Sequence, residues 1–435
     1  MESAPSSAGG PTHSPAGRQA RFALALLLAI NLFNYIDRYI LSAALSKIKV
    51  DFFGVGDANA KFWLGTLTTA FLVSYMLGAP WFGWLADRAS RWTLIGGAVF
   101  VWSLASGASG LSIYFGFNML LVTRMFVGIG EAAYGPTAPA LISDMYPIER
   151  RGQVLSWFYM AIPVGSALGY AFGGQIAEHW HWSWAFYLVV PPGLLLAVAC
   201  FLMRDPQRGA SESRPTVVRH ANWGDYVTLL RTPSYVLNTL GMTAMTFALG
   251  GVAAWMPDYI HDYRQYGTLG HVSLVFGAIT AVSGLVATLL GGLVGDKLSK
   301  RWPGAYFLVS GCGLLLAFPC FLLVLHVSFP WAWFWIFLCE FCLFFNTGPA
   351  NTILANVTHP AVRATGFALN ILVIHLLGDA ISPPLIGLLS DRHGGDMNVA
   401  FRAVSVAILV GAVFWLWGAR YLQRDTERAP TRIEP

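Results

Sequence analysis

Long apolar stretches separated by short polar segments fill almost the whole chain. A helix needs about 20 apolar residues to cross the hydrocarbon core of a bilayer. Stretches of this length lie near 22–45, 62–86, 92–112, 115–142, 153–177, 184–203, 234–260, 271–295, 304–326, 331–356, 362–389 and 399–421. They are continuous, whereas the strands of a transmembrane barrel are short and alternate between apolar and polar residues. The pattern therefore predicts an all-α membrane protein with twelve transmembrane helices.

The composition supports the same class. The chain has 435 residues, of which 56% are hydrophobic and 11% charged. A soluble domain has about 25% charged residues. We therefore expect a multi-pass protein of the cell membrane, inner or plasma, whose surroundings are the lipid bilayer.

The basic residues indicate how the chain is oriented. If the N-terminus is cytoplasmic, 19 of the 27 lysines and arginines lie on the cytoplasmic side, six lie on the other side and two lie within spans. The positive-inside rule then places both termini in the cytoplasm. This distribution also accounts for the net charge of +5, so no nucleic-acid partner is expected.

The longest polar interruption divides the spans into two groups of six. We expect a disordered cytoplasmic N-terminus, two six-helix bundles, a cytoplasmic central loop between them and a cytoplasmic tail. In chain order these parts are 1–20, 21–203, 204–232, 233–422 and 423–435.

The two groups of spans share a motif of glycine, proline and arginine. Gly135-Pro136 is followed by Pro147 and Arg150, and the same residue types recur 213 positions later, from Gly348-Pro349 to Arg363. Parallel six-helix repeats that enclose a central substrate site are typical of secondary transporters. The repeat therefore predicts two pseudo-symmetric bundles.

Two pairs of charged residues stand out inside the spans. Asp37 and Arg38 are adjacent in the first span, and Arg124 and Glu131 lie in the fourth. Arg124 and Glu131 are seven residues apart, so they share one face of a helix about two turns apart. Ionisable residues within a membrane usually mark a transport pathway. A structural ion pair that orients the first and fourth helices is the alternative interpretation.

Several motifs resemble those of a known group of transporters. Gly83-x-Leu85-Ala86-Asp87-Arg88-x-x-Arg91 and Arg124-x-x-x-Gly128-x-Gly130-Glu131-Ala132 resemble loop and fourth-helix signatures of the major facilitator superfamily. More specifically, the chain resembles the Spinster family of sphingolipid and lysolipid transporters, as a bacterial-type homologue. The matching stretches are Asn34-Tyr35-Ile36-Asp37-Arg38-Tyr39, Gly128 to Ala132 with Tyr134, Phe158-Tyr159-Met160-Ala161-Ile162-Pro163, and His375-Leu376-Leu377-Gly378-Asp379-Ala380 with Ser382-Pro383. The resemblance implies the major facilitator fold.

The intramembrane acids and arginines suggest how protons could be coupled to transport. Burial favours the neutral form of a carboxyl group, and a neighbouring guanidinium favours its charged form. Our hypothesis is that Asp37 and Glu131 carry protons while Arg38 or Arg124 alternates between them and an anionic substrate. Which arginine pairs with which acid stays open.

The second half offers further candidates for the substrate cavity, which the Spinster resemblance places beside it. His375 and Asp379 are four residues apart on one helix face. Glu340 and Asn346 lie on the preceding span, and Glu340 and His375 are candidate secondary titrating groups. In the first half, Tyr134 is a candidate cavity residue. The alternative for His375 and Asp379 is that they satisfy each other or the nearby backbone, and Glu340 could face the helix bundle for structural reasons.

The loop signature after the second span implies a cytoplasmic gate. In related transporters its aspartate, here Asp87, lies near the positive end of the eleventh helix, where unpaired amides and the helix dipole stabilise an acid. A plain positively charged loop is the alternative. The gate residues we expect are Gly83, Asp87, Arg88, Arg91, Asp144 and Arg151.

These observations favour transport over catalysis. We recognise no nucleotide-binding loop, Ser-His-Asp arrangement or metal cluster in the sequence, so neither an enzyme nor a cofactor is predicted. We expect a monomeric, proton-coupled transporter that works by alternating access, and the resemblance implies an amphipathic lipid such as a lysophospholipid or a sphingoid phosphate. A proton-coupled symporter of small, hexuronate-like anions is the first alternative, and a membrane sensor that does not transport is the second.

Overall fold

The computed structural model describes residues 15–54, 57, 59–86, 88–146, 148–206, 223–358 and 363–429. Every regular element in these ranges is a helix. The prediction of an all-α protein is therefore confirmed. Much of the expected central loop, 207–222, lies outside the described residues.

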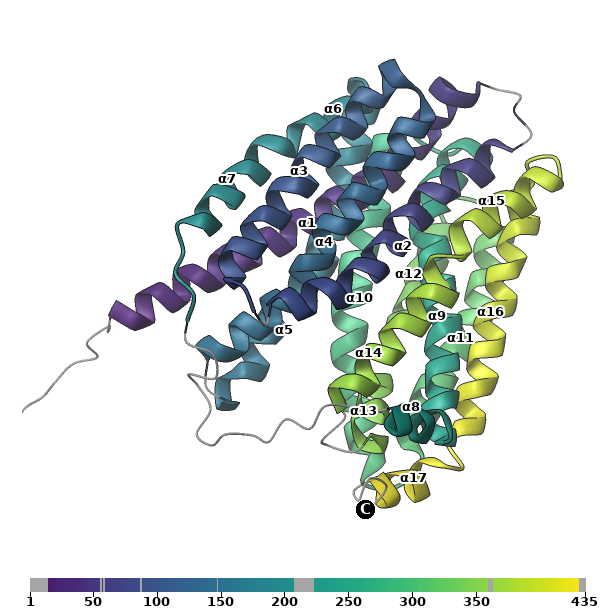
Figure 1. Cartoon of the computed structure of the whole chain (residues 1–435). Coiled ribbons are helices and arrows are strands. Elements are labelled where there is room, and N and C mark those ends of the chain that lie inside the picture. The colour runs from purple at the N-terminus through teal and green to yellow at the C-terminus, as the bar shows by residue number, and fades with distance from the viewer. Residues whose placement is uncertain are drawn as a thin grey trace, which may run out of the picture.

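The first half of the chain forms one helical bundle (Figure 1). Its helices are α1 (Pro15–Phe53), α2 (Ala60–Ala86), α3 (Arg91–Phe115), α4 (Phe117–Met145), α5 (Ile148–His179), α6 (Ser183–Leu188) and α7 (Val190–Phe201). The two short helices α6 and α7 together form the sixth span. They separate next to Pro191 and Pro192, since proline has no N–H to continue a helical hydrogen-bond ladder.

The second half begins with the short helix α8 (Trp223–Leu230) and forms the second bundle. Its remaining elements are α9 (Pro233–Asp258), η1 (Tyr259–Tyr263), α10 (Leu269–Ser299), α11 (Ala305–His326), α12 (Ala332–Phe344), α13 (Thr347–Val357), α14 (Arg363–Ile374), η3 (His375–Asp379), α15 (Ser382–Arg392), α16 (Met397–Gly418) and α17 (Leu422–Arg428). The elements η1 and η3 are single π-helical segments that continue the helices next to them.

Nine segments of the described chain are long and apolar enough to cross a membrane. The other three predicted spans correspond to α4, α5 and the pair α12–α13. Each has a reason for a weaker apolar signal: α4 contains Arg124 and Glu131, α5 begins with charged residues, and the third span breaks between Phe344 and Thr347. The structure therefore accounts for twelve spans.

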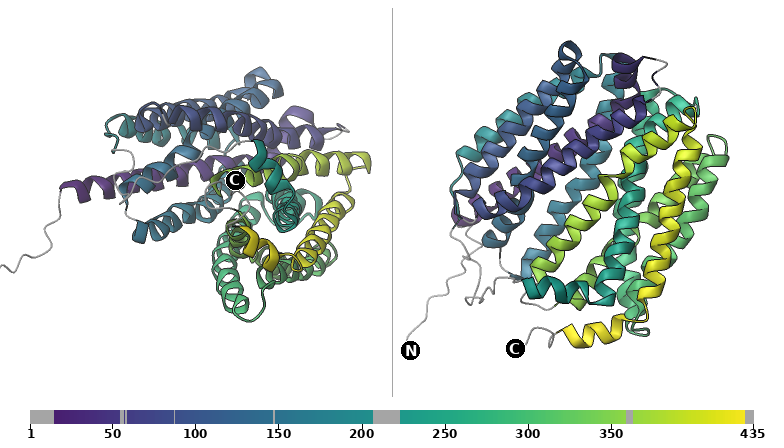
Figure 2. Two further views of the ribbon diagram at one scale, coloured as in Figure 1. Left: turned by 60° about the horizontal axis from the view of Figure 1, so that its bottom comes forward. Right: turned by 45° about the vertical axis from the view of Figure 1, so that its right-hand side comes forward.

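Two pairs of helices make the most extensive contacts between the bundles. Helix α2 packs against α15, and α5 packs against α10. Figure 2 shows the bundles touching at the end of the molecule that is remote from the termini and separating toward the end that carries them. We refer to these as the contact end and the terminal end.

Candidate functional site

Arg38 and Glu131 form an ion pair inside the first bundle. The Nη2 atom of Arg38 lies 2.5 Å from Oε2 of Glu131. Glu131 is buried, whereas 27% of the Arg38 side chain is exposed. The guanidinium also lies over three aromatic rings, 4.7 Å from the ring centre of Phe71, 5.0 Å from that of Tyr35 and 5.9 Å from that of Tyr75. These rings favour a cation at this position.

Asp37 faces a different neighbourhood from Arg38. Adjacent residues point about 100° apart on an α-helix, so Asp37 points toward α3, where it accepts a hydrogen bond from Ser106. It borders a small void of about 10 Å³ between α1, α3 and α7. The strongest opposite charge acting on Asp37 is that of Arg124. Its Oδ2 atom has no hydrogen-bond partner among the described residues.

Arg124, on α4, is almost completely buried. Its Nη2 atom donates a hydrogen bond of 2.7 Å to Ser109 Oγ, and its guanidinium lies 5.0 Å from the ring centre of Phe186. The arginines therefore differ: Arg38 forms an ion pair with Glu131, whereas Arg124 forms none with a described residue and its charge acts on both Asp37 and Glu131. This assignment could not be made from the sequence.

A cavity of about 100 Å³ lies between the bundles, beside Arg38 and Arg124. Its charged lining residues are Arg38, Arg124 and Asp379. Most of the others are apolar or small: Tyr39, Leu41, Ser42, Thr68, Phe71, Leu72, Val127, Gly250, Ala253 and Ala254. The side chains that line the cavity therefore suit a ligand that combines a charged group with an apolar body.

The second half contributes one predicted pair, His375 and Asp379, and the predicted acid Glu340; of these three, Asp379 lines the cavity. The Nδ1 atom of His375 lies 3.0 Å from both carboxylate oxygens of Asp379, because both residues belong to the π-helical segment η3. Single π-helical turns are frequent at functional sites. Glu340 on α12 is buried and accepts hydrogen bonds from Thr280, at 3.1 Å, and Ser283, at 3.3 Å. Both hydroxyl groups come from α10.

Two other predicted site residues lie away from the cavity lining. Tyr134 packs inside the first bundle, where its hydroxyl donates a hydrogen bond of 2.6 Å to the carbonyl of Leu27. Asn346 is buried at the break between α12 and α13 and donates to the carbonyl of Leu343 at 2.5 Å. Their side chains form hydrogen bonds with nearby backbone carbonyls.

Part of the predicted gate is assembled at the terminal end. Arg91 forms an ion pair with Asp144, which joins the start of α3 to the end of α4. Gly83 lies in the last turns of α2, and Arg88 is exposed in the turn that follows. Asp87 and the side chain of Arg151 lie outside the described residues.

The sequence analysis missed Asp205 at the same end. Its carboxylate accepts hydrogen bonds from the backbone N–H groups of Arg91, at 2.9 Å, and Trp92, at 3.0 Å. It therefore satisfies free amides at the start of α3. Its position, directly after the sixth span, was a signal that could have identified it.

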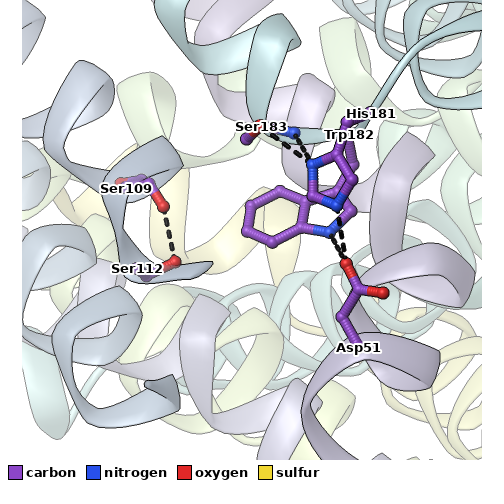
Figure 3. Close-up of polar contacts among 6 residues, drawn as sticks. All are labelled: Asp51, Ser109, Ser112, His181, Trp182 and Ser183. Atoms are coloured by element: carbon purple, nitrogen blue, oxygen red, sulfur yellow. Dashed lines mark hydrogen bonds and ion pairs between the residues drawn. The ribbon is translucent and has the colours of Figure 1, made fainter. Parts of the chain in front are cut away.

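At the contact end, the structure joins a serine, a histidine and an aspartate that the sequence did not suggest (Figure 3). His181 lies 2.9 Å from Ser183 Oγ through Nδ1 and 2.9 Å from Asp51 Oδ2 through Nε2. The indole N–H of Trp182 donates to the same Asp51 oxygen at 2.5 Å. The group ties the end of α1 to the start of α6.

Comparison with known proteins identifies the family. Residues 27–380 match the family model described as Major Facilitator Superfamily. Human protein spinster homolog 1 is 36% identical over 454 residues, which cover 96% of this chain and 84% of the human protein. The chain belongs to the Spinster family. Zebrafish (Danio rerio) protein spinster homolog 3 is 35% identical over 447 residues, which cover 96% of this chain and 88% of the fish protein.

Solved structures give the same fold. A crystal structure of a bacterial homolog of the human lysosomal transporter Spinster, in an inward-facing and unoccupied conformation, has a TM-score of 0.78 and 22% identity, with 97% of this chain and 99% of that chain covered. A D-xylose–proton symporter gives a TM-score of 0.70 at 17% identity, with 91% and 96% covered. This Spinster-family protein thus has the major facilitator fold. It is a secondary transporter and not an enzyme.

Proposed function

We propose that this Spinster-family transporter carries an amphipathic lipid with an anionic head group, lysophospholipid or sphingoid-phosphate-like, by proton-coupled alternating access. The observation that carries the proposal is the Arg38–Glu131 pair at the edge of a largely apolar cavity. A partly exposed arginine can bind a phosphate group through several donors at once. The apolar lining around Phe71 and Leu72 suits an acyl chain.

The same pair provides a way to couple a proton to the substrate. In the substrate-free state, the Glu131 carboxylate holds Arg38. Protonation of Glu131 removes the negative charge that competes for the guanidinium, and Arg38 then binds the head group. Departure of the proton restores the ion pair and releases the substrate. Asp37 and Arg124 are the second acid and the second arginine of this scheme.

The orientation of the protein gives this cycle a direction. With both termini in the cytoplasm, as the distribution of lysine and arginine favours, the terminal end is the inner end and the contact end is the outer end. The structure then corresponds to the inward-facing state of the cycle. A monomer in the cell membrane is sufficient for the scheme.

The first test uses purified protein in liposomes with an imposed pH gradient. If one proton accompanies each substrate, a gradient of one pH unit supports about tenfold accumulation of a fluorescent lysophospholipid. Liposomes without the gradient and without the protein are the controls. Gradient-driven uptake of galacturonate in place of the lipid would contradict the substrate proposal and support the small-anion alternative.

Glu340 provides a separate test of the coupling. If it binds a second proton, Glu340→Gln retains the hydrogen bonds with Thr280 and Ser283 but lowers the accumulation ratio by about tenfold per pH unit, the contribution of one coupled proton. The measurement is the steady-state ratio at several imposed gradients, with Ser283→Ala as the control that leaves the carboxyl in place. An unchanged slope would assign Glu340 to structure alone.

A further inference from the structure

Two carboxylates join the bundles across the contact end. The first is Asp391, in the last turn of α15. Its Oδ2 atom accepts a hydrogen bond of 2.8 Å from the backbone N–H of Phe62, in the first turn of α2. The first N–H groups of a helix have no partner within the helix, and an acid there also interacts favourably with the helix dipole. Asp391 therefore caps a helix of the opposite bundle.

The second carboxylate is Glu178, in the last turn of α5. Its Oε2 atom accepts a hydrogen bond from the backbone N–H of Gly270, in the first turn of α10. This contact also crosses between the bundles. At both places the last turn of one helix supplies an acid to the first turn of a helix from the other half.

The internal repeat relates these two contacts. Glu178 and Asp391 are 213 positions apart, the spacing that also relates Pro136 to Pro349. Each acid follows a glycine by four residues, at Gly174 and Gly387, and these glycines are therefore also 213 positions apart. Residues four apart lie on the same face of a helix.

Both glycines lie where the opposite bundle comes very close. A Cβ atom added to Gly174 would lie 2.6 Å from Ser273 Oγ, and one added to Gly387 would lie 2.8 Å from the backbone N of Phe62. These distances are too short for any other residue without a shift. The glycine thus permits close contact, and the acid four residues later caps the facing helix.

We propose that these two Gly-x-x-x-acid motifs, Gly174–Glu178 and Gly387–Asp391, are equivalent locks that hold the outer gate closed in the inward-facing state. The inference rests on the alternating-access part of the proposed function and requires no particular substrate or coupling ion. When the bundles separate at the contact end, both caps break and water replaces the carboxylates.

The lock between α2 and α15 has an additional cation. Lys61 is buried and donates hydrogen bonds from Nζ to Ser390 Oγ, at 3.0 Å, and to the carbonyl of Gly395, at 3.2 Å. These acceptors lie at and beyond the end of α15, where a helix dipole favours a positive charge. Leu269, which precedes the capped Gly270 as Lys61 precedes the capped Phe62, carries no charge. The α2–α15 lock is therefore the better satisfied of the two.

Caps within a single bundle provide the matched control. Asp396 accepts hydrogen bonds from the N–H groups of Asn398, at 2.8 Å, and Val399, at 3.2 Å, at the start of α16. A hydrogen bond from Tyr263, together with these amides, lowers its pKa, so it is a charged cap at neutral pH. Since it lies wholly in the second bundle, separation of the bundles leaves this cap intact.

The test measures the outer gate directly. In a background without the five cysteines, spin labels at Phe115→Cys and Trp331→Cys lie on exposed positions at the contact end of opposite bundles, outside both locks. Electron–electron double resonance then gives the ratio of outer-open to outer-closed protein. Glu178→Ala and Asp391→Ala should each raise this ratio about fivefold, the factor expected for a lost helix cap. The double variant should raise it about 25-fold, because the two effects add in free energy.

The remaining variants make the result decisive. Glu178→Gln and Asp391→Asn keep an acceptor oxygen and should give smaller shifts in the same direction, and they replace the alanine variants if those fail to fold. Asp396→Ala should lower the thermal unfolding midpoint without changing the distance. A double variant with the wild-type distance distribution would overturn the proposal, and a shift in only one single variant would overturn the equivalence. Absence of lysophospholipid transport by a protein with the expected shifts would contradict the lipid proposal alone.

Discussion

Glu131→Gln is expected to make substrate binding independent of pH. In the wild-type protein, the Glu131 carboxylate competes with an anionic head group for Arg38. Protonation removes this competition, so wild-type affinity should be higher at low pH than at high pH. Glutamine is neutral at every pH and leaves Arg38 free throughout. The variant should therefore bind at both pH values as tightly as the wild-type protein does at low pH.

The measurement is equilibrium binding of a fluorescent lysophospholipid to the purified protein at pH 5.5 and pH 8. We expect wild-type affinity to change by about tenfold, which corresponds to 1.4 kcal/mol, and the affinity of the variant to change by less than about twofold. Asp296→Asn is the matched control, because Asp296 is a carboxylate on α10 that accepts a hydrogen bond from Tyr306 far from the site. A variant that still binds more weakly at high pH would show that another group controls Arg38.

The Glu131→Gln variant should lose transport although it still binds the lipid. With Glu131→Gln no proton has to bind before Arg38 holds the head group, and none leaves to release it, so the variant should bind lipid but lose gradient-driven accumulation. Arg38→Ala should instead lose both, because it removes the group that binds the anion. This contrast separates a coupling residue from a binding residue by two independent measurements.

The sequence was sufficient to predict the fold and the charged residues of the site. Apolar stretches of spanning length predicted the twelve spans, and the isolated charges Asp37, Arg38, Arg124 and Glu131 stood out within them. The reason is physical: both signals depend on composition along one helix, and the bilayer makes an intramembrane charge unusual whatever packs around it.

The partners of these residues could not be predicted, because they depend on how each helix is rotated. Asp37 and Arg38 are adjacent in sequence, yet one faces α3 and the other faces α4. A rotation of about 100° would exchange these two neighbourhoods. The hydrogen bonds from Thr280 and Ser283 to Glu340 likewise depend on the packing of α10 against α12.

The internal repeat was visible in the sequence, but its consequence at the contact end was not. The spacing that relates Pro136 to Pro349 also relates Glu178 to Asp391. Acids in the last turn of a span resemble ordinary loop charges until the structure shows which helix begins opposite them. The symmetry could therefore be recognised in the sequence, whereas the function of the symmetric residues could be inferred only from their contacts in the structure.

Asp37→Asn is expected to abolish gradient-driven transport and also to destabilise the protein. Arg124 is buried, and of the two acids that act on it Asp37 has the larger effect, so the neutral variant leaves a buried arginine without its principal counter-charge. Removing one member of a buried charge pair costs about 3 kcal/mol. Arg124→Met alone should destabilise the protein for the same reason. Thermal unfolding of the purified variants measures this effect.

The double variant Asp37→Asn with Arg124→Met separates structure from transport. It removes both charges, so its unfolding midpoint should return toward that of the wild-type protein. If Asp37 carries a proton, gradient-driven uptake of the lysophospholipid into liposomes should nevertheless remain absent. Recovery of both stability and uptake would mean that the pair only orients helices α1 and α4. Loss of uptake with recovered stability assigns Asp37 to the coupling itself, since the fold then no longer depends on its charge.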